Sequence, residues 1–87
     1  MGDQAGYTNS DGNWNVFLGY QSGYSNASGD WNTFIGHMSG HNNSDGQRNT
    51  FIGDNSGYSN TTAVANVFVG YGSGHDNKTG GGNLFAG

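Results

Sequence analysis

One 17-residue unit is repeated five times in this chain without insertion or deletion, and this period limits what the chain can fold into. Each unit begins with Gly and ends with an Asn-x-Phe-apolar tetrapeptide. The units are residues 2–18, 19–35, 36–52, 53–69 and 70–86. A residue that recurs at one position of every unit, while its neighbours vary, meets the same geometric demand in each copy. We therefore predict a single repeat domain over residues 1–87.

Five positions of the unit hold the same residue type in every copy. The first and fifth are Gly, the eighth and fourteenth are Asn, and the sixteenth is Phe. The Asn and Phe positions are occupied by Asn9, Asn26, Asn43, Asn60 and Asn77, by Asn15, Asn32, Asn49, Asn66 and Asn83, and by Phe17, Phe34, Phe51, Phe68 and Phe85. In a stack of units, identical residues lie above one another, and side-chain amides can hydrogen-bond to the copies above and below. The sequence predicts two Asn ladders, one Phe ladder and columns of Gly.

The composition argues against both an ordinary globular domain and a flexible linker. Only 31% of the 87 residues are hydrophobic, so a conventional core is hard to build. Fourteen of the 18 Gly fall at the first, fifth and eleventh positions of the unit, which is unlike a random Gly-rich linker. With no Pro and 9% charged residues, the chain also lacks the composition of ordinary disorder.

The charge balance and the missing residue types exclude several functions. Arg48 and Lys78 oppose six Asp, and the net charge of −4 repels a phosphate backbone, so we expect no nucleic-acid partner. The absence of Cys excludes disulfides and Cys-based zinc sites. No apolar run approaches the roughly 20 residues that cross a bilayer, so we expect no membrane insertion. The chain starts at a unit boundary without a visible export signal, and we expect it to be a segment of a longer protein.

The period and the residue types predict an all-β parallel solenoid, or β-roll, of five 17-residue coils. The unit is too short for helix-pair repeats, and Gly, Asn and Ser are poor helix formers. The clearest strands are the segments around Phe, residues 14–18, 31–35, 48–52, 65–69 and 82–86. We expect a weaker second strand in each unit, as at residues 22–24 and 39–41, with turns between the two. Coils spaced by roughly 4.8 Å would form a rod of roughly 24 Å.

The Phe strand is apolar on both faces. The fifteenth and seventeenth positions point to one side, and Phe at the sixteenth points to the other. A lone thin solenoid would cover one face with its second strand and leave the other in water, and a continuous apolar stripe signals a partner. We therefore expect several chains to associate.

The Asn-Thr-Phe-Ile-Gly strand, the following Ser-Gly and the Asn-x-x-Gly turn resemble a known repeat family. They are similar to the Gly-rich head repeats of trimeric autotransporter adhesins and to repeats in trimeric tail-fibre proteins of phages and bacteria. The comparable adhesin strand is Asn-Ser-Val-Ala-Ile-Gly. The resemblance spans nearly the whole chain, although the 17-residue period is longer and Phe replaces a small aliphatic residue. It implies a left-handed parallel β-roll, a homotrimer of intertwined or packed chains, and an extracellular location on a cell surface or a virion.

No group of residues predicts catalysis, a cofactor or a metal centre. The chain has no Glu, no Cys and no Ser-His-Asp arrangement, so we expect no enzyme activity. The four-residue spacing of His37 and His41 would favour a metal on a helix, but this segment is rich in Gly. His41 and His75 occupy a position that otherwise holds Tyr, which indicates interchangeable flat rings. Four sites fit the glycosylation pattern, and a turn role explains the fixed Asn among them: Asn26, Asn42, Asn60 and Asn77.

The positions that vary between units are the better candidates for binding, because a scaffold fixes its core and leaves exposed positions free. The second and thirteenth positions supply exposed rings and one cation, which suit sugar stacking or a protein contact. The candidate contact residues are Trp14, Trp31, Tyr20, Tyr71 and Arg48. The alternative is that both Trp only cover the edge of the apolar strand.

These observations leave three functional hypotheses. The first is a structural and adhesive module, a rod-like trimeric segment of a tail fibre or surface adhesin that presents a receptor- or glycan-binding flank. The second is a monomeric carbohydrate-binding solenoid that uses Trp14, Trp31 and Tyr20. The third is an ice-binding solenoid, which is weaker because only Thr33 and Thr50 share an outward position.

Overall fold

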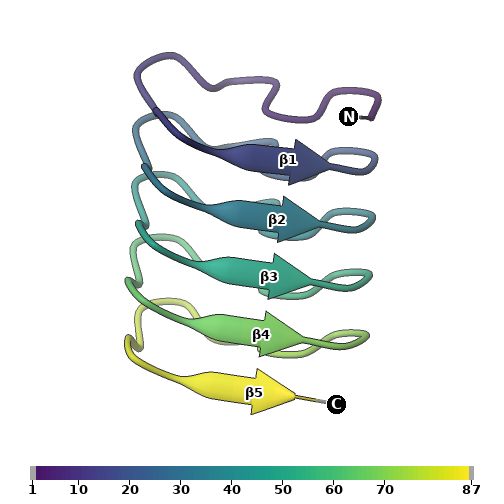
Figure 1. The fold of residues 1–87 in the computed structure, drawn as a ribbon, viewed down its shortest axis with the longest axis vertical. Helices are drawn as coiled ribbons and strands as arrows, with labels where there is room; N and C mark the ends of the chain where they lie inside the picture. The colour runs from purple at the N-terminus through teal and green to yellow at the C-terminus, as the bar shows by residue number, and fades with distance from the viewer. Residues whose placement is uncertain (1, 87) are drawn as a thin grey trace.

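The computed structural model describes residues 2–86 and contains one parallel β-sheet of five short strands. The strands are β1 (Val16–Leu18), β2 (Thr33–Ile35), β3 (Thr50–Ile52), β4 (Val67–Val69) and β5 (Leu84–Ala86). They pair in chain order, and each residue lies opposite its copy in the next unit, as Phe17 lies opposite Phe34. The chain makes four turns of a parallel β-solenoid between β1 and β5 (Figure 1), which confirms the predicted all-β solenoid.

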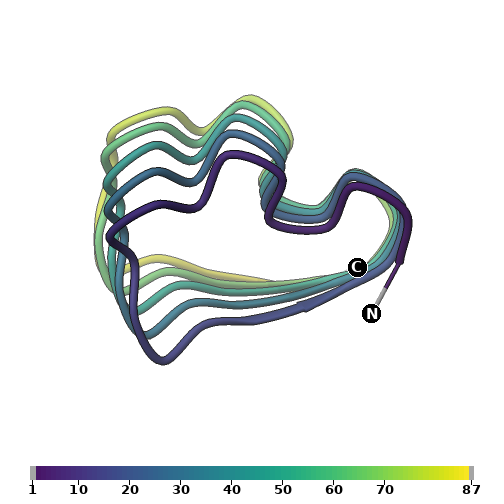
Figure 2. The ribbon, with the colours of Figure 1, turned by 90° about the horizontal axis from the view of Figure 1, so that it is seen from above.

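The coils follow almost the same path when they are viewed along the stack. Figure 2 shows the strands along one gently curved side and an indented loop path along the opposite side. The molecule measures 28 × 20 × 17 Å, and its longest dimension follows the stack. Each coil is therefore a narrow loop, with room inside for a single layer of side chains.

The centre of each coil is filled by one Phe ring. Phe34, Phe51 and Phe68 have no exposed surface. The five Phe rings stack with centroids 4.7–5.3 Å apart. The sixteenth position points inward, and the residues beside it on the strand point outward, as the alternation of the strand predicts. The predicted Phe ladder is confirmed.

The eighth-position Asn form a ladder of side-chain amides beside the Phe stack. The Nδ2 of Asn26 donates to the Oδ1 of Asn9, and the Nδ2 of Asn43 donates to the Oδ1 of Asn26, both at 2.7 Å. The Nδ2 of Asn43 also donates to the carbonyl of Gly46, three residues further on. Asn26, Asn43 and Asn60 are fully buried. An amide suits this column because it donates and accepts at once, so every copy can satisfy the next.

The fourteenth-position Asn also link successive coils, but through the backbone. The Oδ1 of Asn32 accepts the backbone N–H of Asn49 at 3.0 Å. Its Nδ2 donates to the carbonyl of Gly46 at 2.8 Å. This column therefore differs from the first, because each side chain holds the main chain of the next coil rather than the amide of its copy.

The strands are shorter than the predicted five residues because the thirteenth position has a left-handed backbone. Trp14, Trp31, Arg48 and Ala65 have φ of 56–63°, which a strand cannot contain. The fourteenth position then directs its amide inward, and strand pairing begins at the fifteenth. The expected strands at residues 14–18, 31–35, 48–52, 65–69 and 82–86 are thus each reduced to their last three residues.

The predicted second strand is wrong. Residues 22–24 and 39–41 form turns. Gln21 and Gly23 both have positive φ, of 54° and 60°, and the alternation of extended and left-handed residues breaks the pleat. The N–H of Tyr24 donates to the carbonyl of Gln21, three residues back, as in a β-turn. The wall opposite the strands is therefore a run of tight turns.

A Ser at the fourth position of the unit connects the turn wall to the Phe strand. We expected this Ser to lie in the second strand. Four of the five units carry it, and the Oγ of Ser22 donates to the carbonyl of Phe34 at 2.8 Å. Ser39 repeats the bond to Phe51. The recurrence of Ser at the fourth position of four units is the sequence signal that could have predicted this hydrogen bond.

A comparison of Gly40→Ala with Gly72→Ala distinguishes the energetic cost of a clash with the Phe stack from the cost of backbone strain. Both Gly have left-handed φ, of 60° for Gly40 and 63° for Gly72. A Cβ at Gly40 would lie 2.5 Å from Cδ2 of Phe34, whereas a Cβ at Gly72 meets nothing within 4 Å. We expect Gly72→Ala to lower the free energy of unfolding by about 1 kcal/mol. Gly40→Ala should lower it by about 3 kcal/mol, because the stacked ring cannot move aside. Urea denaturation measures both, and equal losses would contradict the wedged ring.

Asn43→Asp tests the amide ladder without changing side-chain volume. The carboxylate cannot donate to Asn26 or Gly46, so we expect a loss of about 3 kcal/mol in the free energy of unfolding at neutral pH. Burial beside two acceptors favours the protonated carboxyl, whose stabilising contribution is present at low pH and lost as pH rises. The deficit relative to wild type should therefore shrink at about pH 3.

Asn9→Asp is the matched control for this ladder. Asn9 is exposed, and its Oδ1 would keep accepting from Asn26. We expect a loss below about 1 kcal/mol, because the one lost bond, to the carbonyl of Gly12, is exposed. Similar losses for the two variants would show that burial of the ladder contributes little.

Candidate functional site

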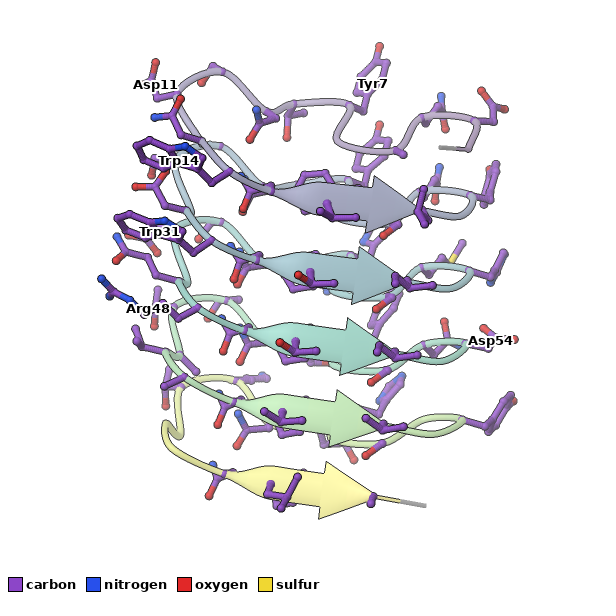
Figure 3. All side chains as sticks on the ribbon, in the orientation of Figure 1. Tyr7, Asp11, Trp14, Trp31, Arg48 and Asp54 are labelled. Carbon is purple, nitrogen blue, oxygen red and sulfur yellow. The ribbon has the colours of Figure 1, made fainter. Side chains whose placement is uncertain are left out.

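The outer face of the sheet is an exposed aliphatic surface. It is formed by the fifteenth and seventeenth positions, which hold no charged residue in any unit. Val16 is 47% exposed and Leu84 is 73% exposed. This outer strand face consists of Val16, Leu18, Thr33, Ile35, Thr50, Ile52, Val67, Val69, Leu84 and Ala86. It faces the viewer in Figure 3.

Trp14, Trp31 and Arg48 come together in one column at the N-terminal ends of the strands. The two indole rings stack at 5.1 Å with planes 7° apart. The Cζ of Arg48 lies 4.6 Å from the centroid of the Trp31 ring. The left-handed backbone of the thirteenth position directs these side chains away from the coil (Figure 3). We call these three residues the Trp–Arg column.

The Trp–Arg column leaves little ring surface for a sugar. One face of Trp31 is covered by Trp14 and the other by the Arg48 guanidinium. Trp14 is 70% exposed and keeps one free ring face. Stacking on a sugar needs an open aromatic face, so Trp31 does not offer the contact that its residue type suggested.

Tyr20 and Tyr71 lie in a different column, at the opposite ends of the strands. The ring of Tyr20 stacks on His37 at 5.4 Å, and the Nδ1 of His37 lies 3.2 Å from the Oδ1 of Asp54. Asp54 projects at the opposite edge from Trp31 in Figure 3. Tyr71, in the following coil, is 78% exposed. The structure therefore does not combine Tyr20 or Tyr71 with the two Trp in one site.

A third ring column runs along the turn wall at the sixth position. Its neighbouring rings stack with centroids 5.0–5.2 Å apart, so Tyr and His do act as interchangeable flat rings here. Its members are Tyr7, Tyr24, His41, Tyr58 and His75. The recurring ring at the sixth position predicted this column, but only the structure shows that all its rings stack on one another.

No metal centre or enclosed pocket is found among residues 2–86. No group of three or more His, Cys, Asp or Glu side chains converges in this range. His37 and His41 belong to separate ring columns. The described residues also contain no helix long and apolar enough to cross a membrane. Asn26 and Asn60 are buried in the amide ladder, which leaves no space for a glycan on them.

No family model, curated protein or solved structure matches this chain.

The contact between Trp31 and Arg48 should be energetically measurable. A double-mutant cycle with Trp31→Leu and Arg48→Met keeps a side chain at each left-handed position and removes the ring and the charge in turn. We expect a coupling energy of about 0.5–1 kcal/mol in urea denaturation, typical of an exposed cation–π pair. A coupling energy indistinguishable from zero would mean that the guanidinium is free of the ring in solution.

Proposed function

We propose that this chain is a structural and adhesive module, a rod-like segment of a homotrimeric surface fibre or adhesin. The observation that carries the proposal is the outer strand face, where aliphatic side chains are exposed in β1, β3, β4 and β5 and half-buried in β2. A continuous apolar surface of this kind marks an interaction site, because its exposure to water is unfavourable. Burial between three chains around a common axis removes that surface from water.

The character of the coil supports a scaffold rather than a catalyst. Each coil is closed by ladders of hydrogen bonds and one Phe ring, and it adds a constant step to the length of the rod. The location outside the cell or on a virion is part of the same proposal and follows from the resemblance to adhesin and fibre repeats. The exposed columns at the strand ends provide a flank for a receptor or a glycan.

The two alternative functions have weaker support. A monomeric lectin would use the faces of Trp14, Trp31 and Tyr20, but Trp31 is covered on both sides and Tyr20 lies at the other strand end. An ice-binding face needs a regular array of one residue type. Thr33 and Thr50 are neighbours in β2 and β3, whereas the other strands place Val or Leu at that position.

Solution mass tests the homotrimer. Three chains of 9.1 kDa give about 27 kDa, and we expect sedimentation equilibrium to find this mass. Ile52→Lys places a charge at the centre of the outer strand face and should yield a 9.1 kDa particle. Ser28→Lys adds the same charge at an exposed turn position away from the strands and should leave the trimer intact.

Two results would contradict the proposed assembly. A wild-type mass of one or two chains would exclude the trimer. Dissociation by Ser28→Lys as readily as by Ile52→Lys would show that the outer strand face is not the contact.

A further inference from the structure

The guanidinium of Arg48 is a cation that pairs with no acidic side chain among the described residues. The two ion pairs within residues 2–86 both involve His rather than Arg48. The side chain is exposed, and its Cζ lies 4.6 Å from the centroid of the Trp31 ring, which in turn stacks on Trp14. This contact limits the orientations that the guanidinium samples before a ligand arrives, which reduces the entropy lost on binding.

The acid in the adjacent coil is engaged elsewhere. The Oδ1 of Asp30 accepts the backbone N–H of Asn13 at 2.8 Å, and Asn13 belongs to the first coil. Arg48, in the third coil, contacts Asp30 through the main chain, because its N–H donates to the Asp30 carbonyl at 3.0 Å. The Asp30 carboxylate is thus directed toward the first coil, away from the guanidinium of Arg48. The N–H donors of the guanidinium therefore stay available to a ligand.

The column changes from aromatic to small residues directly after Arg48. The thirteenth position holds Ala65 and Gly82 in the next two coils, so no ring covers the second side of the guanidinium. Val64, which precedes Ala65 in the chain and lies outside the outer strand face, is 41% exposed, and Ala65 is also exposed. A ligand whose anionic group meets Arg48 can therefore rest an apolar surface on this part of the fourth coil.

We infer that Arg48 and the apolar surface following it bind the carboxylate of an acidic saccharide of the uronic acid type. A planar carboxylate accepts two parallel N–H bonds from a guanidinium fork. The C–H face of the pyranose ring suits the exposed Val and Ala side chains. A singly charged group also suits a chain of net charge −4 better than a phosphate does. The choice of a saccharide rests on the proposed function as an adhesive module.

Titration of glucuronate into the ¹⁵N-labelled 87-residue chain, at constant ionic strength, tests this inference by NMR. Arg48 is the one Arg of the sequence, so its Nε–H signal is unambiguous. We expect saturable shifts of this signal and of the Trp31 indole N–H, with a dissociation constant in the millimolar range on this open surface. Glucose, which lacks the carboxylate, should give no comparable shift.

Two variants separate a specific site from general electrostatics. Arg48→Gln and Lys78→Gln each change the net charge from −4 to −5, so their overall attraction for an anion is equal. Gln also suits the left-handed backbone of Arg48, because Gln4 and Gln21 have φ of 59° and 54°. Arg48→Gln should weaken glucuronate binding at least about tenfold, whereas Lys78→Gln should bind like wild type.

Several outcomes would overturn the inference. Equal losses in the two variants would reduce the effect to net charge, and equal shifts with glucose would remove the role of the carboxylate. Acetate binding as tight as glucuronate binding would remove the saccharide. Sedimentation of the same samples keeps this result separate from the assembly. A trimer that ignores glucuronate overturns the site alone, and a 9.1 kDa particle that binds it overturns the trimer alone.

Discussion

In-register stacking of identical positions is the constraint on which the rest of this structure depends. Each side chain inside a coil must be satisfied by its own copy in the next coil, because strand pairing holds the units in register. A Phe stacks on Phe, and an amide donates to one neighbour while it accepts from the other. The core is one residue wide and is completed by amide ladders. A chain with 31% hydrophobic residues can therefore fill it.

The same constraint governs the outer columns, where the sequence varies more. Residues at one position lie about 4.8 Å apart in successive coils, so like charges there would repel strongly. Asp occurs at the second and tenth positions of two units each, and in neither case are the two units adjacent. Asp54 instead meets His37, and Arg48 meets Trp31. The residue types at a surface position are thus limited to those that can lie close to the residues at the same position in the adjacent coils.

Stacking also determines which surface chemistry remains available. Rings that cover one another contribute to the stability of the rod and lose the faces with which aromatic residues hold sugars. The exposed aliphatic strand face is covered by no element of residues 2–86, and the donors of Arg48 pair with no acid there, so we propose these features for association and ligand binding. This division separates the fixed positions, which build the solenoid, from the variable positions, where we propose the contacts.

The sequence by itself determined the 17-residue period, the Phe stack, the Asn columns and the opposite directions of the sixteenth position and its neighbours, because these follow from repetition and strand alternation. Only the tertiary structure decided where the strands begin, that the turn wall is not a strand, and that both faces of Trp31 are covered. The left-handed third and thirteenth positions hold Gln, Met, Trp, Arg and Ala as well as Asn55, Gly72 and Gly82. Only Gly and Asn favour positive φ, and they occupy three of these ten positions. Closure of the coil imposes the conformation on the other residue types, so the local pattern was too sparse to predict it.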